Sequence, residues 1–303
     1  MFFGAANTRS YQKLSLGDYA GKDSPCVTLV NPVPPVVKVC ACADKVGFFV
    51  RAMTQSRQQA IRAYYYTLFS AWGCQHWWPA QSRLEMIVGA YLTQNTAWTN
   101  VEKALENLRR ARLLTLDGIR STSRRQLEQL IRPSGYFRQK AQRLKIFIRY
   151  LDKNYGGSLS RMFARPTDQL RAELLALNGV GPETADSILL YAGNHPVFVV
   201  DAYTRRILER HEIISPNASY EEVRELCERG LSETSTPTTA TTTGNPRGSH
   251  HRPSRISRAK RTELVQAYND MHGLIVGVGK NYCLKSQPRC DQCPLQKFLP
   301  KAI

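Results

Sequence analysis

Residues 177–192, LNGVGPETADSILLYA, combine a glycine turn with the start of a helix. Gly179 and Gly181 flank Val180, so the backbone can turn sharply there and leave amide N–H groups uncovered. Pro182 suits a first helical position, because a helix start has no use for the missing N–H. Free N–H groups at a helix N-terminus attract anions. The turn therefore predicts a phosphate-binding hairpin, with an ordinary helix–turn–helix corner as the alternative for these residues alone.

Two carboxylates accompany this turn. Glu183 lies in the first turn of the helix that Pro182 opens, where the helix dipole favours an acid. Asp201 follows in VFVVDAYTRRILER and suits the N-cap of the next helix, a role worth about 1 kcal/mol. A carboxylate held in such a place can also stabilise a developing positive charge and orient or activate water. Asp201 is therefore the candidate catalytic residue, and helix capping is a compatible second role.

The chain is strongly basic. Its 303 residues include 42 lysines and arginines against 24 acidic residues, which gives a formal net charge of +18 and a pI near 9.8. Such an excess attracts a polyanion through counterion release, so nucleic acid is the leading candidate partner; improved solubility or a basic tail is the alternative for charge alone. The sequence shows neither a long apolar run nor a signal-peptide pattern, which predicts a soluble, cytoplasmic protein with no membrane partner.

Cysteines are concentrated near the C-terminus. Cys283, Cys290 and Cys293 follow the spacing C-x6-C-x2-C. The other cysteines are scattered, at Cys26, Cys40, Cys42, Cys74 and Cys227. This distribution differs from the disulfide framework of a small secreted domain, and it favours a reducing compartment with one thiolate cluster of the metal-binding type.

Helical periodicity dominates the middle of the chain. Apolar residues recur at three-to-four spacing in RLEMIVGAYLTQNTAWTNVEKALENL and QKAQRLKIFIRYLDKNYG, and again in ELVQAYNDMHGLIVGVGK. Turn signals at Pro79 and within residues 132–136, 178–182 and 193–196 separate the predicted helices. The pattern predicts an all-α fold.

Two segments depart from this pattern. Residues 1–56 contain NPVPPVV and no amphipathic stretch, which predicts a poorly ordered extension, with the first helix opening near Met53. Residues 232–262 are rich in threonine, serine and proline and then basic, which predicts a flexible insertion. The basic end of this insertion, residues 247–261, either contacts DNA phosphates or is a solvated loop.

The string LNGVGPETADSILLYA followed by VFVVDAYTRRIL resembles the helix–hairpin–helix DNA glycosylases of the endonuclease III superfamily, whose signature is L-x-G-V-G-x-x-T-A with V-D at the start of the next helix. The resemblance runs from about Trp77 to Cys293, without the insertion, and includes YLTQNT at 91–96 and RPSGYFRQKA at 132–141. Among the branches, the chain looks most like 3-methyladenine DNA glycosylase III. That branch shares WWP, LTQNT followed by an aromatic residue, RPSG(Y/F) and a glutamate after the hairpin.

The resemblance implies an architecture and a partner. The expected fold has two helical lobes with a DNA cleft between them, one formed by residues 76–196 and the other by residues 57–75 together with 197–303. The expected partner is double-stranded DNA that contains a damaged base, bound by a monomer in the cytoplasm, or at the nucleoid if the source is bacterial.

The resemblance also implies a reaction. Removal of a base passes through an oxocarbenium-like sugar, which the Asp201 carboxylate would stabilise. Glu183 occupies the position at which bifunctional members carry a Schiff-base lysine, and a carboxylate cannot form that imine. Lys140 and Lys280 lie in matched regions, but nothing in the sequence places either amine at the sugar. We therefore expect a monofunctional glycosylase acting on alkylated purines. The alternatives are a glycosylase and lyase for oxidised pyrimidines, action on uracil or thymine mismatches, and a non-catalytic DNA-binding module.

Other residues match family positions that hold DNA or the extruded base. Gln94 matches the residue that fills the gap left in the duplex. The full set of expected DNA-binding residues is Gln94, Asn95, Gly179, Val180, Gly181 and Thr184. Trp77, Trp78 and Trp98 are the candidates for the base pocket, where a cationic base would gain roughly 0.5–2 kcal/mol from each indole face. The alternative for each tryptophan is a place in the core.

The cysteine spacing matches an incomplete cofactor loop. The family's [4Fe–4S] loop is C-x6-C-x2-C-x5-C, and Leu299 stands at its fourth position here. Cys283, Cys290 and Cys293 could hold a cluster with an unknown fourth ligand. The alternatives are zinc with Cys227 or a histidine, or no metal at all. Hydrolysis of the bond between base and sugar would not depend on this loop.

Overall fold

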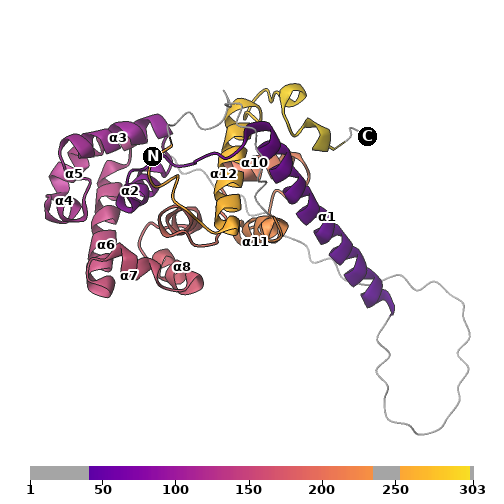
Figure 1. Cartoon of the computed structure of the whole chain (residues 1–303), viewed down its shortest axis with the longest axis horizontal. Coiled ribbons are helices and arrows are strands. Elements are labelled where there is room, and N and C mark those ends of the chain that lie inside the picture. The colour runs from indigo at the N-terminus through magenta and orange to yellow at the C-terminus, as the bar shows by residue number, and fades with distance from the viewer. Residues whose placement is uncertain (1–40, 235–252, 301–303) are drawn as a thin grey trace, which may run out of the picture. The chain divides into compact units, whose positions relative to one another are not determined.

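The structure is a computed structural model that describes residues 41–234 and 253–300, with side chains from residue 55 onward. The chain divides into two compact units, Met1–Lys45 and Val46–Ile303, and the first contributes only the start of one helix to the described residues. Every regular element within those residues is helical and none is a strand, which confirms the predicted all-α fold (Figure 1). No helix in the described ranges is both long and apolar enough to cross a membrane.

Most of the regular elements follow one another with short connections, and the connection from α11 to α12 is the long one. The longer helices are α1 (Ala41–Trp72), α2 (Arg83–Thr93), α3 (Trp98–Arg110), α6 (Phe137–Tyr155), α8 (Thr167–Leu175), α10 (Ala202–Arg210), α11 (Tyr220–Leu231) and α12 (Glu263–Asn281). The short ones are α4 (Leu116–Ser121), α5 (Arg124–Leu130), η1 (Arg132–Ser134), α7 (Leu159–Phe163), α9 (Pro182–Ser187), η2 (Ile188–Gly193), η3 (Cys290–Gln292) and η4 (Gln296–Phe298).

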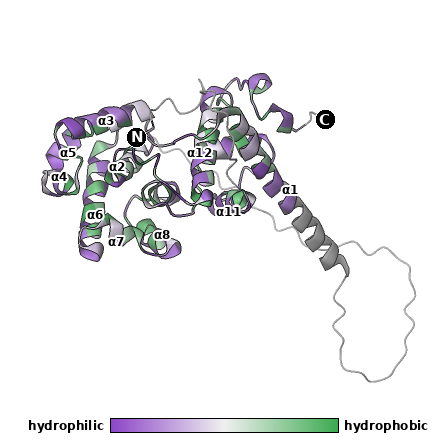
Figure 2. Cartoon of the chain, in the orientation of Figure 1, coloured by the Kyte–Doolittle hydropathy of each residue, from purple (hydrophilic) through white to green (hydrophobic). Residues whose placement is uncertain are grey.

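Polar caps explain where many of these helices begin. In each case a short side chain accepts a hydrogen bond from an amide N–H of the first turn, which satisfies a group that the helix leaves unpaired. The residues that do this are Ser82, Thr115, Ser123, Ser158, Asp201, Ser219 and Thr262. Hydrophilic and hydrophobic residues alternate around helices such as α6 and α8 (Figure 2), so packing of their apolar sides supplies most of the remaining stability.

Helix α2 lies at the centre of one group of helices. All of its residues from Leu84 to Leu92 are buried, and it packs against α3, α6, α9 and η2. Close approach is possible at Gly89, because an added Cβ would lie only 3.2 Å from the Trp78 ring. Helix α2 therefore sets the positions of the hairpin helix α9 and of the loop that follows Thr93.

Helix α12 has the corresponding role for the later part of the chain. It packs against α10, α11 and η2. A Cβ on Gly279 would lie 2.2 Å from the Tyr203 ring, so only glycine lets α12 approach α10 this closely. Helix α1 joins this group, because Arg62 donates to the Gly230 carbonyl at 3.2 Å and Ile61 packs on the same glycine.

The boundaries of two predicted segments need correction. Helix α1 begins at Ala41, so the extension predicted for residues 1–56, with a helix from Met53, is too long; residues 41–52 hold no proline and only Gly47 to interrupt a helix. Residues 1–40 lie outside the described residues.

The predicted flexible insertion, residues 232–262, is also too long at its end. Ser254 and Ser257 are buried and bond to each other, with Ser257 Oγ 2.8 Å from the Ser254 amide nitrogen. Arg261, from the basic end predicted to contact DNA or solvent, donates instead to the Ile256 carbonyl at 2.9 Å and to Asn194 Oδ1 at 3.1 Å. Residues 253–262 therefore pack on the helical body, while residues 235–252 lie outside the described residues.

One buried lysine ties together the loops that follow α2 and η1. Lys140 Nζ donates to the Leu92 carbonyl at 2.9 Å, to Thr96 Oγ1 at 2.8 Å and to the Ser134 carbonyl at 2.7 Å. These bonds use all three N–H groups of the ammonium. Burial lowers the pKa of Lys140 to about 8. Lys140 is thus a structural residue and offers no free amine to a substrate.

Replacing Lys140 should destabilise the fold. Lys140→Met removes a buried donor from the Leu92 and Ser134 carbonyls and from the partly buried Thr96 hydroxyl, and we expect the free energy of unfolding to fall by about 2 kcal/mol or more in urea titrations. Lys145→Met is the matched control. Lys145 also donates to backbone carbonyls, at 2.6 Å to Ile119 and 3.0 Å to Arg120, but it is only half-buried, so water can replace it. If both variants lose the same free energy of unfolding, burial of Lys140 does not explain its effect on stability.

Candidate active site

The hairpin between α8 and α9 has the geometry that the glycines predict. Gly179 has φ +78°, a left-handed conformation that other residues adopt only with strain, and a Cβ there would lie 1.9 Å from the Arg143 side chain. Gly181 is different, since its backbone is extended and an added Cβ would meet no atom within 4 Å. The fold therefore requires glycine at 179, whereas Gly181 borders open space from which a ligand can approach the backbone.

A buried ion pair fixes the two helices of the hairpin. Arg171 of α8 donates to both carboxylate oxygens of Asp186 on α9, at 2.7 and 3.1 Å, and Asp186 is fully buried. The same guanidinium reaches Glu221 of α11 at 2.7 Å. No local pattern in the sequence predicts this pairing, because its partners lie on opposite sides of the turn.

Gln94 and Thr184, two of the expected DNA-binding residues, meet on the hairpin. Gln94 Nε2 donates to the Gly179 carbonyl at 2.9 Å and to Thr184 Oγ1 at 3.0 Å. Gln94 Oε1 accepts from Arg143 at 2.6 Å. Asn95, next along the chain, is exposed with φ +52°. In this state the Gln94 amide is bonded to the hairpin, so its predicted role in filling a gap in DNA would require these bonds to open.

Asp201 caps α10 and is almost enclosed. Its Oδ1 accepts from the Thr204 amide at 2.7 Å and from the Thr204 hydroxyl at 2.9 Å, while its Oδ2 lies 3.6 Å from His272 Nε2. The side chain is 12% exposed. Burial raises the pKa of Asp201, but His272 and Thr204 together outweigh burial and hold the pKa below its usual value. Asp201 is therefore an ionised carboxylate in a largely dry place.

Glu183 has the opposite tendency. Desolvation by surrounding protein and the charge of Asp201 raise the pKa of Glu183 to about 7, against a smaller lowering effect of His272. Residue 183 as a whole is solvent-exposed. Two neighbouring carboxylates with separated pKa values can divide the roles of charge stabiliser and proton acceptor or donor.

The three tryptophans have different surroundings. Trp78 is buried, with its ring centroid 5.0 Å from that of Tyr191 and 5.4 Å from that of Trp98. Trp77 is half-buried and stands edge-on to His272 at 6.1 Å. Trp78 is thus a core residue that supports Trp98, and Trp77 is the tryptophan that contacts the histidine beside Asp201.

Lys280 was not selected from the sequence as a site residue. Its Nζ lies 5.7 Å from the centre of the Trp77 ring. Surrounding protein lowers the pKa of Lys280, while the charges of Asp201 and Glu102 oppose that change. An amine therefore lies within electrostatic reach of Asp201. The sequence places Lys280 in a region that matches the family, but its position over Trp77 is set by tertiary packing and could not be predicted from local pattern.

The terminal cysteines line one small hollow together with Arg210, His211 and Leu299. Arg210 donates to Cys283 Sγ at 3.2 Å, and His211 Nδ1 lies 2.8 Å from the Tyr64 hydroxyl. Within the described part of the chain, no three histidine, cysteine, aspartate or glutamate side chains are grouped closely enough to hold a metal ion. Leu299, which the resemblance places at the fourth ligand position, lines the same hollow and offers no metal-binding atom.

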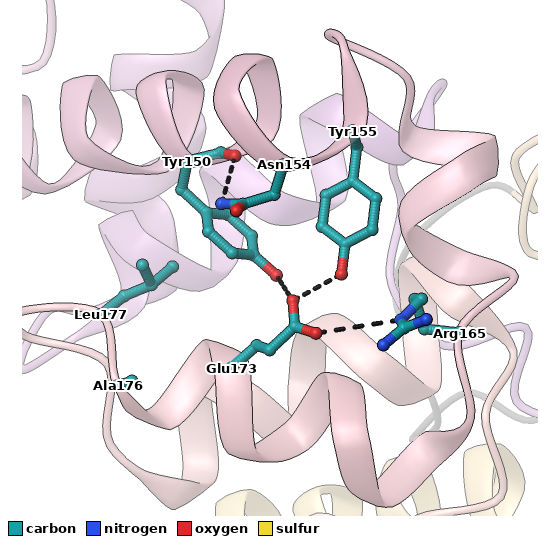
Figure 3. A pocket seen from close by; sticks show the side chains of 7 residues that line it. All are labelled: Tyr150, Asn154, Tyr155, Arg165, Glu173, Ala176 and Leu177. Atoms are coloured by element: carbon teal, nitrogen blue, oxygen red, sulfur yellow. Dashed lines mark hydrogen bonds and ion pairs between the residues drawn. The ribbon is translucent and has the colours of Figure 1, made fainter.

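A separate hollow of about 460 Å³ shares no residue with these sites (Figure 3). Two tyrosine hydroxyls at its wall, from Tyr150 and Tyr155, donate to Glu173 Oε2 at 2.6 and 2.5 Å. Arg165 approaches the other oxygen at 3.9 Å. The Glu173 carboxylate is thus satisfied within the protein, and the arrangement holds α8 against the end of α6.

Several known proteins are similar to this chain in sequence. Residues 88–233 match the HhH-GPD superfamily base excision DNA repair proteins. A putative DNA repair glycosylase of Methanocaldococcus jannaschii is 38% identical over 248 residues, which are 81% of this chain and 98% of that protein. Endonuclease III-like protein 1 of Bos taurus is 28% identical over 226 residues, which are 74% of this chain and 61% of that protein.

A solved structure is also similar. The H. pylori 3-methyladenine DNA glycosylase bound to 1,N6-ethenoadenine matches with a TM-score of 0.57 and 29% identity, over 74% of this chain and 97% of that chain.

The coupling of the two carboxylates can be measured by NMR. We expect the Glu183 carboxyl to titrate near pH 7, and Asp201→Asn to lower its pKa because the neighbouring charge is gone. The folded state binds this proton more tightly than the unfolded state, so the stability contribution of Glu183 falls as pH rises from about 4.5 to 7. Glu222 is the control, since the Ser219 amide and hydroxyl lower its pKa. An Asp201→Asn effect on Glu222 rather than Glu183 would disprove the coupling.

Proposed function

Since the chain belongs to the HhH-GPD superfamily of base excision DNA repair proteins, we propose that it is a monofunctional DNA glycosylase that releases an alkylated purine and leaves the abasic strand intact. The observation that carries this proposal is the pair of carboxylates. Asp201 is ionised and enclosed, and Glu183 stands at the position where a Schiff-base lysine would be required for strand cleavage.

The chain's own groups can perform each step of hydrolysis. As the bond from the sugar to the base breaks, its electron pair leaves with the base, and positive charge develops on the sugar. The Asp201 carboxylate stabilises that charge without rearrangement, because Thr204 already holds it. Water then attacks the sugar carbon and loses a proton. Glu183, with a pKa of about 7, is ionised often enough at neutral pH to accept it.

The hairpin supplies the DNA contact. The exposed backbone at Gly181 opens onto free space beside the N-terminus of α9, and the net charge of +18 favours a polyanion. Asn95 is exposed beside Gln94, and both lie on the loop that Lys140 fixes from behind. We propose that a monomer binds duplex DNA here, and that Gln94 leaves the hairpin to fill the gap in the base stack.

Two observations bear on the substrate. The likeness to the H. pylori 3-methyladenine DNA glycosylase favours an alkylated purine, and Trp77 and Trp98 supply flat surfaces for it. Lys280 over Trp77 places a positive charge near the same surface. A neutral adduct beside Trp77 is therefore repelled less by the Lys280 ammonium than a cationic base is. Both kinds of lesion belong in the test.

The second candidate is a glycosylase and lyase for oxidised pyrimidines. It is favoured by the similarity to the Bos taurus endonuclease III-like protein and by Lys280, whose pKa is lowered and whose charge reaches Asp201. A non-catalytic DNA-binding module is less consistent with the structure, because a buried charged carboxylate is costly where no charge has to be stabilised.

Base release and strand cleavage distinguish these functions. The protein is incubated with duplexes that contain 3-methyladenine, 1,N6-ethenoadenine or an oxidised pyrimidine, with and without alkali or borohydride. We expect release of an alkylated purine, with strand breaks only after alkali. A borohydride-trapped adduct would establish the lyase, and its loss in Lys280→Met would identify the amine. DNA binding without release from any duplex would leave the non-catalytic module.

Asp201→Asn tests the catalytic carboxylate. Asparagine also caps helices well, so the fold should persist. We expect base release to fall about 100-fold or more, because the charge that stabilises the sugar cation is lost, while DNA affinity stays within about twofold. The comparison uses single-turnover rates and DNA titrations of both proteins. Activity that survives in this variant is incompatible with the mechanism.

Glu183→Lys tests why strand cleavage is absent. The change places an amine at the first turn of α9, near Asp201, where it can attack the sugar. We expect borohydride to trap a covalent DNA adduct of this variant and none of the wild type. Glu222→Lys, at the first turn of α11, is the control and should give no adduct.

A further inference from the structure

A buried chain of three side chains, Tyr191, His272 and Asp201, connects three elements of the fold. We propose that His272 is a positioning residue that holds and orients the Asp201 carboxylate, and that Tyr191 sets the proton arrangement of His272. The inference builds on the proposed function, because Asp201 is the carboxylate that would face the sugar.

The geometry places His272 between two partners. Its Nδ1 is hydrogen-bonded to the Tyr191 hydroxyl, and its Nε2 lies 3.6 Å from Asp201 Oδ2. Tyr191 belongs to η2, His272 to α12, and Asp201 caps α10. Tyr191 is 1% exposed and His272 is 5% exposed. The imidazole cannot turn away into solvent, so its two ring nitrogens face the phenol and the carboxylate.

The position of the proton follows from the phenol. Burial and then the charge of Asp201 raise the pKa of Tyr191 well above its usual value, so the phenol keeps its proton. When the phenol donates to Nδ1, the neutral imidazole carries its own proton on Nε2. When His272 is protonated, Nε2 carries a proton as well. In both of these states Nε2 carries a proton, and it lies 3.6 Å from Asp201 Oδ2.

The two oxygens of Asp201 therefore have separate supports. Oδ1 is held by the amide and hydroxyl of Thr204, both on α10. Oδ2 faces only His272 among the polar contacts described for it, and His272 comes from another helix. Without His272, the carboxylate keeps its cap contacts but loses the group that fixes its second oxygen. Orientation and charge of Asp201 thus depend on the packing of α12 against α10.

Other charged and titratable groups act on this chain and belong in the interpretation of any pH profile. On α9, Glu183 interacts with both Asp201 and His272. The remaining groups are Tyr203 on α10, Asp270 and Lys280 on α12, and Arg261 in the segment before α12. Glu183 titrates in the neutral range, so the effect of His272 must be measured on Asp201 directly.

The test is a ¹³C NMR titration of the Asp201 carboxyl, assigned with Asp201→Asn, in wild type and His272→Leu. We expect His272→Leu to raise the pKa of Asp201 by about one unit. At pH values below the wild-type pKa of Asp201 this lowers the ionised fraction of the carboxylate about tenfold, and base release falls with it, whereas release at neutral pH changes little. His272→Gln retains a side-chain N–H and should recover part of the shift. Tyr191→Phe keeps the packing on Trp78 and should give a smaller shift in the same direction.

His195→Leu is the matched control. His195 is also a buried histidine with a hydroxyl partner, since its Nδ1 lies 3.0 Å from Thr167 Oγ1, and it should leave the Asp201 titration unchanged. Melting temperatures show whether each variant folds. An unchanged pKa of Asp201 in a folded His272→Leu protein, or an equal shift in His195→Leu, overturns the inference.

The titration needs no substrate. A raised pKa in a protein that releases no base supports the role of His272 and overturns the proposed function alone. An unchanged pKa of Asp201 in a folded His272→Leu protein that still releases base leaves the proposed function standing and overturns only the inference.

Discussion

A single buried charge organises this structure. The Asp201 carboxylate has little contact with water, and an isolated charge in such a place would be very costly. Its stability depends on the N–H and O–H donors at the start of α10 and on His272 from α12. Desolvation and then the charge of Asp201 raise the pKa of neighbouring Glu183. The separation between the pKa values of the two carboxyl groups is therefore a consequence of where three helices meet.

The packing of these helices depends on residues that take no part in the proposed reaction. Gly279 lets α12 approach the Tyr203 ring on α10, because a Cβ at this position would clash with that ring. On the DNA side, Arg171 and Asp186 clamp the two hairpin helices, and Lys140 fixes the loop that carries Thr96. The residues proposed to touch DNA are thus supported from behind by buried polar contacts, which are directional and give a defined geometry.

The C-terminal loop has only three of the four thiol ligands that the resemblance implies, and its start is nevertheless held in a defined position. Arg206 of α10 donates to the Cys283 carbonyl at 2.7 Å, and Arg210 donates to the carbonyls of Leu284 and Lys285 at 2.6 and 2.8 Å. These charge-assisted bonds attach the start of the loop to the helix that Asp201 caps. The attachment uses backbone oxygens, so it does not require a fourth thiol at Leu299.

The sequence by itself determined the helical class, the hairpin, and Asp201 as a helix cap, because periodicity, turn glycines and capping residues act over a few neighbouring positions. It also singled out Glu183, since a glutamate side chain cannot form the imine that a lysine forms. It misjudged residues 41–56 and 253–262, where local composition resembles loop. His272, Tyr191, Arg143 and Lys280 were left for the tertiary structure to reveal. Their roles arise from side chains far apart in the sequence that packing brings within a few ångströms, and the pKa values of the carboxylates depend on those distances rather than on residue type.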